Sequence, residues 1–309
     1  MKRIIDISQD NRHLSKQRGF LVVSHDTEEI ARVALDDILA IIVHSHGVTY
    51  SNSVLCELAK RGSILVLCGS NHFPIAYLGA IEGHHAQSGR IRDQLNATLP
   101  LKKNLWRQIV RQKILMQAAV LNAHHQSTSR LQMLSKNIKS GDSTNIEAQA
   151  ARIYWRSLMG LDFKRDHQKN DVNALLNYGY TILRATVARS IIASGLHASV
   201  GLHHSNKLNS FILADDLVEP FRPLVDYISK SLLVKGKSDL SGPVKRSIAR
   251  VIEYELNINN TQSSVSNTIQ RLCNSLVQSF NVGKPKLDLF AIPTPMELSA
   301  LSQDNGTEQ

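Results

Sequence analysis

Brief apolar runs separated by turn-forming residues dominate roughly the first 80 residues of the chain. Asn, Gly, Ser and Pro bound these runs, which is typical of β-strands. Segment 51–61 has instead the pattern of a helix, with Ser51 as its cap and Gly62 as its stop. We therefore predict a small β-sandwich or curled sheet with one helix at one end. The expected strands are residues 3–7, 19–24, 40–44, 64–67 and 75–78.

The pattern becomes helical from residue 101 onward. Apolar residues recur every three to four positions in 101–122, after Glu147, within 165–189 and in 263–280. The segment between the two patterns is small and polar, as linkers are. The fold class we predict is therefore α+β with two domains, a small β domain followed by a larger all-α domain. The expected boundaries are 1–82 for the β domain, 83–100 for the linker, 101–290 for the helical domain and 291–309 for an irregular tail that is disordered from 302 on.

The net positive charge of the chain indicates that it binds an acidic partner. The chain has 309 residues, 42% of them hydrophobic, and a formal net charge of +10. The excess is spread over helical stretches, which favours nucleic acid over a membrane surface as the acidic partner. The sequence contains no run of about 20 apolar residues and no signal-peptide core. Cys56, Cys68 and Cys273 lie far apart in apolar surroundings, so we expect buried, reduced thiols and a cytoplasmic protein.

The stretch 201–226 combines histidines with acids. His203 and His204 precede Asp216 and Glu219, and these two acids share one helical face with Arg222. Pro220 and Pro223 lack amide protons and would bend the backbone beside the acids. Imidazole with carboxylate oxygens suits a divalent ion such as Mn²⁺ or Mg²⁺. The alternative is a solvated helix face with a histidine pair that merely fills space.

A third acid is needed to complete such a site, and Glu147 is the candidate. Thr144 and Glu147 form the pattern of a capping box, so a helix cap is one interpretation. Glu147 also heads an apolar stripe with Ala150, Ala151 and Tyr154, which points it into the protein. A buried carboxylate needs a partner, and a shared metal ion would be one.

Basic residues without neighbouring acids mark the segment 101–122. We expect this basic face to contact phosphates, the alternative being plain solubility. Lys113 belongs to it by sequence, and Trp106 is interpreted as core and not as a platform for a base. Asn177 and Arg184 either line a polar cavity or pack between helices. The residues we expect to contact DNA are Lys102, Lys103, Arg107, Arg111, Arg184, Arg222, Lys245 and Arg246.

Four motifs follow one another along the chain. They are Glu147-Ala-Gln-Ala-Ala-Arg-Ile-Tyr-Trp, Leu176-Asn-Tyr-Gly-Tyr, Gly201-Leu-His-His, and Asp216-Leu-Val-Glu-Pro-Phe-Arg-Pro-Leu-Val-Asp226. In this order they resemble the CRISPR-associated adaptation integrase family, the nuclease-like subunit that inserts new spacers. The length is similar to that of the type II branch, and the resemblance covers essentially the whole chain.

The resemblance implies a set of roles. Glu147, His204 and Glu219 would bind Mg²⁺ or Mn²⁺ and carry catalysis, and the family spacing selects His204 over His203. Asp216 would either be a ligand or hold one in place, with Asn177 as a further supporting residue. The implied partners are prespacer and repeat DNA, a second copy of the chain, a small dimeric CRISPR-associated protein and, as a further candidate, the effector nuclease.

The implied reaction is attack by a DNA 3′-hydroxyl on a phosphodiester of the repeat, assisted by the metal ion. Two other classes of protein share much of this pattern. One is a structure-specific DNA nuclease, and the other is a non-catalytic DNA-binding scaffold whose acids only pair with arginines.

Overall fold

Two four-stranded sheets form the N-terminal part of the protein. The computed structural model describes residues 3–69, 74–81, 83–166, 168–169, 171–206 and 208–302. One sheet has the order β1-β5-β7-β8, with β8 antiparallel to the rest, and the other has the order β4-β3-β2-β6. The strands are β1 (Arg3–Ile7), β2 (Arg12–Gln17), β3 (Phe20–His25), β4 (Glu28–Ala34), β5 (Ile38–Val43), β6 (Val48–Tyr50), β7 (Ile64–Cys68) and β8 (Pro74–Leu78).

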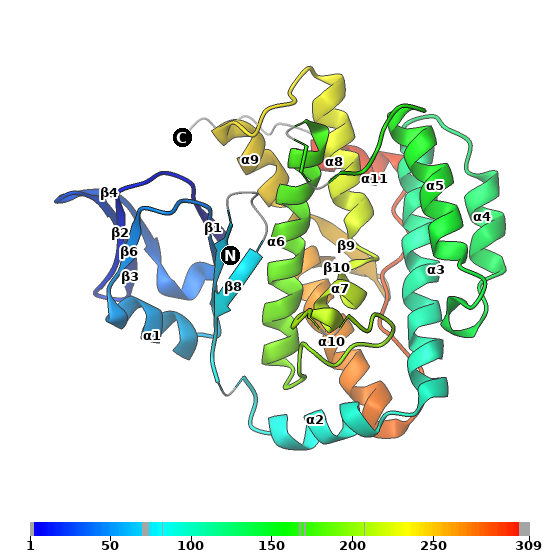
Figure 1. Ribbon diagram of the computed structural model, residues 1–309, viewed down its shortest axis with the longest axis horizontal. Coiled ribbons are helices and arrows are strands. Elements are labelled where there is room, and N and C mark those ends of the chain that lie inside the picture. Colours follow the sequence, from blue (N-terminus) through cyan, green and yellow to red (C-terminus); the bar gives the residue numbers. More distant parts are fainter. Residues whose placement is uncertain are drawn as a thin grey trace.

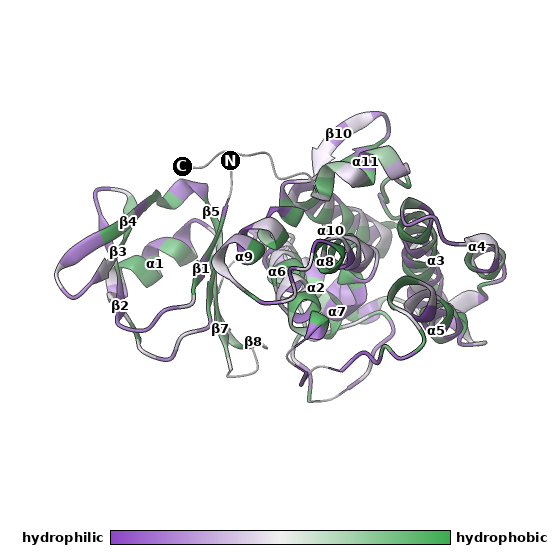
Figure 2. Ribbon diagram, turned by 90° about the horizontal axis from the view of Figure 1, so that it is seen from above, coloured by the Kyte–Doolittle hydropathy of each residue, from purple (hydrophilic) through white to green (hydrophobic). Residues whose placement is uncertain are grey.

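The two central strands of the first sheet, β5 and β7, are buried on both faces, which explains their continuous apolar sequences. In β5, Ile41 and Val43 face the second sheet, whereas Ala40 and Ile42 join the core of the helical domain. Successive side chains of a strand point to opposite faces of the sheet, so β5 contributes alternate residues to two hydrophobic cores. Helix α1 (Asn52–Lys60) lies between the sheets and buries Val54 (Figure 2). The prediction of a small β-rich part with one helix is confirmed, but the helix lies between the two sheets and not at one end.

Helices make up most of the remaining chain (Figure 1). Helix α6 runs beside the first sheet and is apolar nearly all round, as expected for a central helix. Helices α3, α5 and α8 lie on its far side. The helices are α2 (Gln87–Asn96), α3 (Leu99–Ala123), α4 (Ser129–Lys136), α5 (Ile146–Met159), α6 (Val172–Ala193), α7 (Ile212–Val218), α8 (Arg222–Val234), α9 (Gly242–Ala249), α10 (Val265–Val282) and α11 (Pro295–Ser299).

The helical domain is not purely helical. Strands β9 (Glu255–Ile258) and β10 (Thr261–Ser264) form an antiparallel hairpin between α9 and α10. Asn259 and Asn260 both have positive φ, which is the backbone of a tight hairpin turn. The expectation of an all-α domain is therefore corrected to a mostly helical one.

Like β9 and β10, three strands of the N-terminal part escaped the sequence prediction because their sequences lack a clear strand pattern. β4 is almost entirely exposed, and β2 places only Leu14 fully inside. β6 has only three residues. None of the three carries the apolar run or the strict alternation on which a strand prediction depends.

The segment predicted as a linker holds helix α2. Arg90 donates to the carbonyl of Ser194, and buried Gln94 donates to the carbonyls of His197 and Val200. The predicted tail is also partly ordered, because α11 begins with a capping box of Thr294 and Glu297. Residues 303–309, where disorder was expected, lie outside the described residues.

The three thiols differ in exposure. Cys68 and Cys273 are buried, as predicted, whereas Cys56 is exposed on α1, so that part of the prediction was wrong. Among the described residues, no helix combines the length and the apolar character needed to cross a membrane.

Candidate metal centre

Glu219 lies at the junction of two helices. Helix α7 ends at Val218, and α8 begins at Arg222, so Asp216, Glu219 and Arg222 do not share one continuous helix. Pro220 interrupts the helix here because it has no amide proton. The interruption keeps Glu219 close to Arg222, whose Nη1 lies 2.9 Å from Glu219 Oε1.

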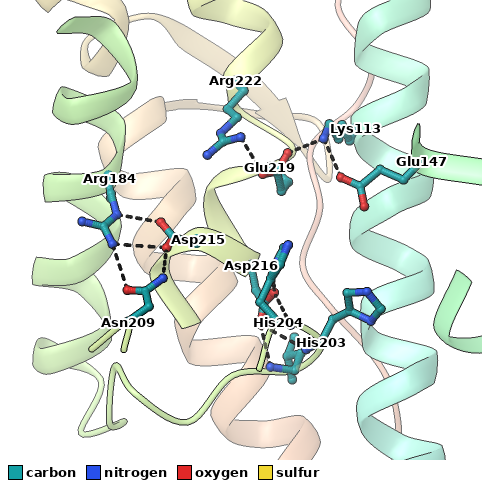
Figure 3. Close-up of polar contacts among 11 residues, drawn as sticks. Lys113, Glu147, Arg184, His203, His204, Asn209, Asp215, Asp216, Glu219 and Arg222 are labelled. Carbon is teal, nitrogen blue, oxygen red and sulfur yellow. Dashed lines mark hydrogen bonds and ion pairs between the residues drawn. The ribbon is translucent and has the colours of Figure 1, made fainter. Parts of the chain in front are cut away.

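Asp216 holds the loop that carries the histidines (Figure 3). Its Oδ2 accepts from the amides of Leu202 at 2.6 Å and His203 at 3.2 Å, and its Oδ1 accepts from the amide of His204 at 3.3 Å. The carboxylate is fully buried. Three amides and an imidazole share its two oxygens, so Asp216 has an anchoring role in this structure.

Gly201 lets the loop approach Asp216 so closely. A Cβ at this position would lie 2.3 Å from Ile212 Cγ2 and 2.8 Å from Asp216 Oδ2. Any other residue would push the loop away from the carboxylate.

The two histidines have different surroundings. His204 Nδ1 lies 2.6 Å from Asp216 Oδ1, and this hydrogen bond raises the pKa of the imidazole, with smaller contributions from Glu219 and Glu147. His203 stacks on the buried Trp106, with ring centroids 4.5 Å apart and planes 3° apart. Trp106 is core, as predicted. A histidine held at Nδ1 by a carboxylate can offer Nε2 to a metal ion.

Glu147 lies in the first turn of α5 but does not cap the helix. Asn145, the N-cap residue, has a left-handed backbone and makes no side-chain cap. Asp142 takes that function, because its carboxylate accepts from the amides of Ile146 at 2.8 Å and Glu147 at 3.0 Å. The capping-box interpretation of Glu147 was therefore wrong, and its side chain is turned toward α3.

Lys113 on α3 joins Glu147 to Glu219 (Figure 3). Its Nζ lies 2.6 Å from Glu147 Oε1 and 2.5 Å from Glu219 Oε2. Burial alone would lower the pKa of Lys113, but the two carboxylates raise it above its ordinary value. Burial alone would raise the pKa of Glu219, but Arg222 and Lys113 hold it below its ordinary value.

Sequence reasoning missed this role of Lys113, which had been placed on the exposed basic face. Helical spacing contained the signal, since Lys113 lies seven residues after Trp106 and four before Gln117, both of which are buried. A lysine on the apolar stripe of a helix must meet an acid or leave the core.

The donors suit a divalent metal ion, although no metal-binding geometry is assembled. Within the described parts of the chain, no three His, Cys, Asp or Glu side chains lie close enough together to hold a metal. Two carboxylates nevertheless converge on one cation, the Lys113 ammonium, and Asp216 holds His204 nearby. Oxygen ligands with one imidazole are the set that Mn²⁺ and Mg²⁺ sites use.

A second buried network lies behind Glu219. Tyr154 and Tyr180 both donate to Asp226, and the Arg222 guanidinium lies 5.0 Å from the centre of the Tyr180 ring. Burial raises the pKa of Asp226 to about 6, against the lowering effect of the two hydroxyls. The network fixes Arg222, which in turn holds Glu219.

Asn177 and Arg184 line a cavity of about 410 Å³ together with Arg165 and Arg222, which is the first of the two alternatives given for them. Arg165 Nη2 donates to Asn177 Oδ1 at 2.6 Å. Arg184 pairs with Asp215 through Nε at 2.6 Å, so much of its charge is already satisfied within the chain. Asn177 thus lines the same cavity as Arg222, which pairs with Glu219.

The other basic residues predicted to contact DNA differ in how far their side chains are exposed. Lys103, Arg107 and Arg111 are exposed at four-residue spacing on α3, and Lys102 is half-buried. Arg246 is exposed on α9. Lys245, by contrast, turns toward the β domain, where its Nζ lies 3.7 Å from Asp6 Oδ2.

The protein thus has two domains, a β domain and a mostly helical domain, and the helical domain contains the carboxylates and a histidine. Comparison with known proteins shows to which family this arrangement belongs. A family model described as CRISPR associated protein Cas1 matches residues 5–247. The chain belongs to the Cas1 family. It is 37% identical over 279 residues to a CRISPR-associated endonuclease Cas1 from Neisseria meningitidis, covering 89% of this chain and 90% of the relative.

Solved structures share the fold. A casposase bound to integration product superposes with a TM-score of 0.78 at 19% identity, covering 99% of this chain and 95% of the other. A Cas6-RT-Cas1–Cas2 complex gives 0.74 at 16% identity, covering 94% of this chain and 36% of the other. The resemblance inferred from the four motifs is thus confirmed at the level of family and fold.

Proposed function

We propose that this protein is a divalent-metal-dependent DNA integrase and endonuclease that inserts new spacer DNA into a CRISPR array. The observation that carries the proposal is the meeting of Glu147 and Glu219 on one buried cation, beside an imidazole held by Asp216. The Cas1 family and the endonuclease name of the Neisseria relative support the same reading.

Strand transfer requires only an exchange of phosphodiester bonds. The 3′-oxygen of the incoming strand forms a bond to phosphorus, and the bond from phosphorus to a 3′-oxygen of the repeat breaks. The attacking hydroxyl loses a proton and the leaving oxygen gains one, so no outside energy source or covalent enzyme intermediate is needed. With water as the attacking group, the same site would cut DNA.

Glu147, His204 and Glu219 are the residues that would hold the metal ion. A bound Mg²⁺ or Mn²⁺ lowers the pKa of an attacking hydroxyl and offsets charge on the phosphorane-like transition state. Asp216 orients His204, and Arg222 holds Glu219 from the side opposite Lys113. The chain thus supplies positioning and electrostatics, which are what phosphoryl transfer needs most.

Partners follow from the same proposal. The substrates would be prespacer and repeat duplexes, and the chain would act as a homodimer joined by a small dimeric partner. One structural neighbour is a Cas6-RT-Cas1–Cas2 complex, which supports such a partner. We expect the protein in the cytoplasm, where these DNA molecules are.

A strand-joining assay tests the function. Purified protein with its partner, a duplex with free 3′ ends, a repeat-bearing duplex and Mn²⁺ or Mg²⁺ should give a joined product that chelation abolishes. Cutting without joining would indicate a nuclease instead. Binding without either reaction would indicate a scaffold and would overturn the proposal.

The exposed face of α3 should position DNA through its phosphates. Replacing Lys103, Arg107 and Arg111 with glutamine should weaken DNA binding and reduce the slope of log K against log salt by about 2 to 3 units, because each phosphate contact contributes about 0.9. Titrations at several salt concentrations measure the slope. The matched control replaces three exposed basic residues elsewhere, Lys60, Arg130 and Lys284. Equal slopes for the two variants would remove α3 from the DNA path.

A further inference from the structure

Lys113 differs from the three exposed basic residues of α3. Its side chain is 12% exposed, whereas Lys103, Arg107 and Arg111 face solvent. Its neighbours Gln112 and Ile114 are buried. In the described part of the chain, the Lys113 ammonium pairs with the two carboxylates of the candidate metal centre.

The charges at this point of the structure are balanced before any metal enters. Glu147 and Glu219 carry two negative charges, and Lys113 and Arg222 carry two positive ones. The Glu219 side chain is 5% exposed, so its charge is costly without a partner. Without Lys113, the two carboxylates would face each other across a gap of low dielectric and repel.

A divalent ion and the ammonium cannot share this position. An ion bound to both carboxylates would lie about 2.0–2.2 Å from their oxygens. The ammonium already lies 2.6 and 2.5 Å from the same two side chains, so both cations would fall within contact distance of each other. Their repulsion makes the two occupancies alternatives.

We propose that Lys113 is a positioning residue that holds Glu147 and Glu219 together until the metal ion arrives, and that the metal binds by displacing its ammonium. This inference rests on the proposed function, because it takes those two acids as metal ligands. Lys113 therefore preserves the arrangement of the acids and also competes with the metal for them.

Mn²⁺ binding without DNA tests the competition. Lys113→Met keeps an unbranched apolar stem of similar length and removes the ammonium, so this variant should bind Mn²⁺ about tenfold or more tightly than the unaltered protein. Its melting temperature without metal should fall by about 5 °C or more, since a buried pair is broken, and Mn²⁺ should restore it. Lys113→Arg should return the affinity to about its original value. Lys136→Met, at an exposed position on α4, is the control and should change neither quantity.

A measurement on the unaltered protein guards against misfolding of the variant. Acetylation of Lys113, quantified by mass spectrometry, should be slow without metal and several-fold faster with Mn²⁺, while Lys103 reacts equally in both. The inference is overturned if Mn²⁺ binds, Glu219→Gln abolishes that binding, and yet Lys113→Met leaves the affinity unchanged or weaker. If the unaltered protein binds no Mn²⁺ at all, the metal centre itself fails, and the inference fails with it.

Discussion

Replacing Glu219 with glutamine is expected to lower the rate of strand joining by about a thousandfold or more, while the protein still binds DNA. Glutamine keeps the size of the side chain but removes the negative charge that faces Lys113 and Arg222. It also replaces one carboxylate oxygen with an amide nitrogen that cannot bind a metal ion. The joining assay measures the rate, and a mobility-shift titration measures DNA affinity.

Glu255→Gln is the matched control for this experiment. Glu255 is exposed on β9, and its replacement should leave both quantities unchanged. Melting curves check that the Glu219 variant is folded. A folded Glu219→Gln protein that joins DNA at the original rate would show that Glu219 is not a ligand.

Asp216→Asn is expected to reduce Mn²⁺ affinity by about ten- to a hundredfold, the usual effect of losing the residue that orients a metal-binding histidine. Both oxygens of Asp216 accept hydrogen bonds, from two amides on one side and from the His204 amide and ring on the other. An amide group would direct its own N–H bonds at one of these sets of donors. Each buried donor left without a partner costs about 1–3 kcal/mol, so the loop with His204 should loosen.

The effects of the Asp216 and Glu219 variants can be distinguished by measuring the joining rate at several Mn²⁺ concentrations. Raising Mn²⁺ should restore much of the joining rate of Asp216→Asn, because its ligands are all present but poorly held. The same increase should not rescue Glu219→Gln. Asp239→Asn, at an exposed position, is the control. A normal Mn²⁺ affinity in Asp216→Asn would mean that the loop does not carry a ligand.

The sequence predicted the neighbourhood of the site better than its contacts. Glu147, His204 and Glu219 belong to separate motifs, and the structure brings their segments together in the helical domain. The anchoring role of Asp216 was one of two alternatives, because the spacing of His204 and Asp216 alone does not show that a loop folds back onto the acid. The contacts that it makes are long-range, and a periodic pattern does not encode them.

Two errors concern residues of the site. Lys113 was grouped with its basic neighbours by composition, although its position on the helix places it on the buried side. Glu147 was given a possible capping role by its spacing from Thr144, but Asp142 caps the helix instead. Helical spacing could have prevented the first error, whereas only the path of the backbone decides which acid caps α5. The polar strands β2 and β4 were missed because hydrogen-bond pairing, and not hydrophobicity, defines them.

The first sheet packs one face against the second sheet and the other face against the helices. The helical domain therefore cannot be separated from this sheet without exposing part of its core. Ala40, Ile42 and Val66 are covered by helices, and Tyr178 of α6 donates to Asp6 of β1 at 2.6 Å. A fragment that contained only the helices would expose to water the apolar surface that the sheet covers. The helical part of the molecule, which holds Glu147 and Glu219, therefore depends on packing against the first sheet for its fold.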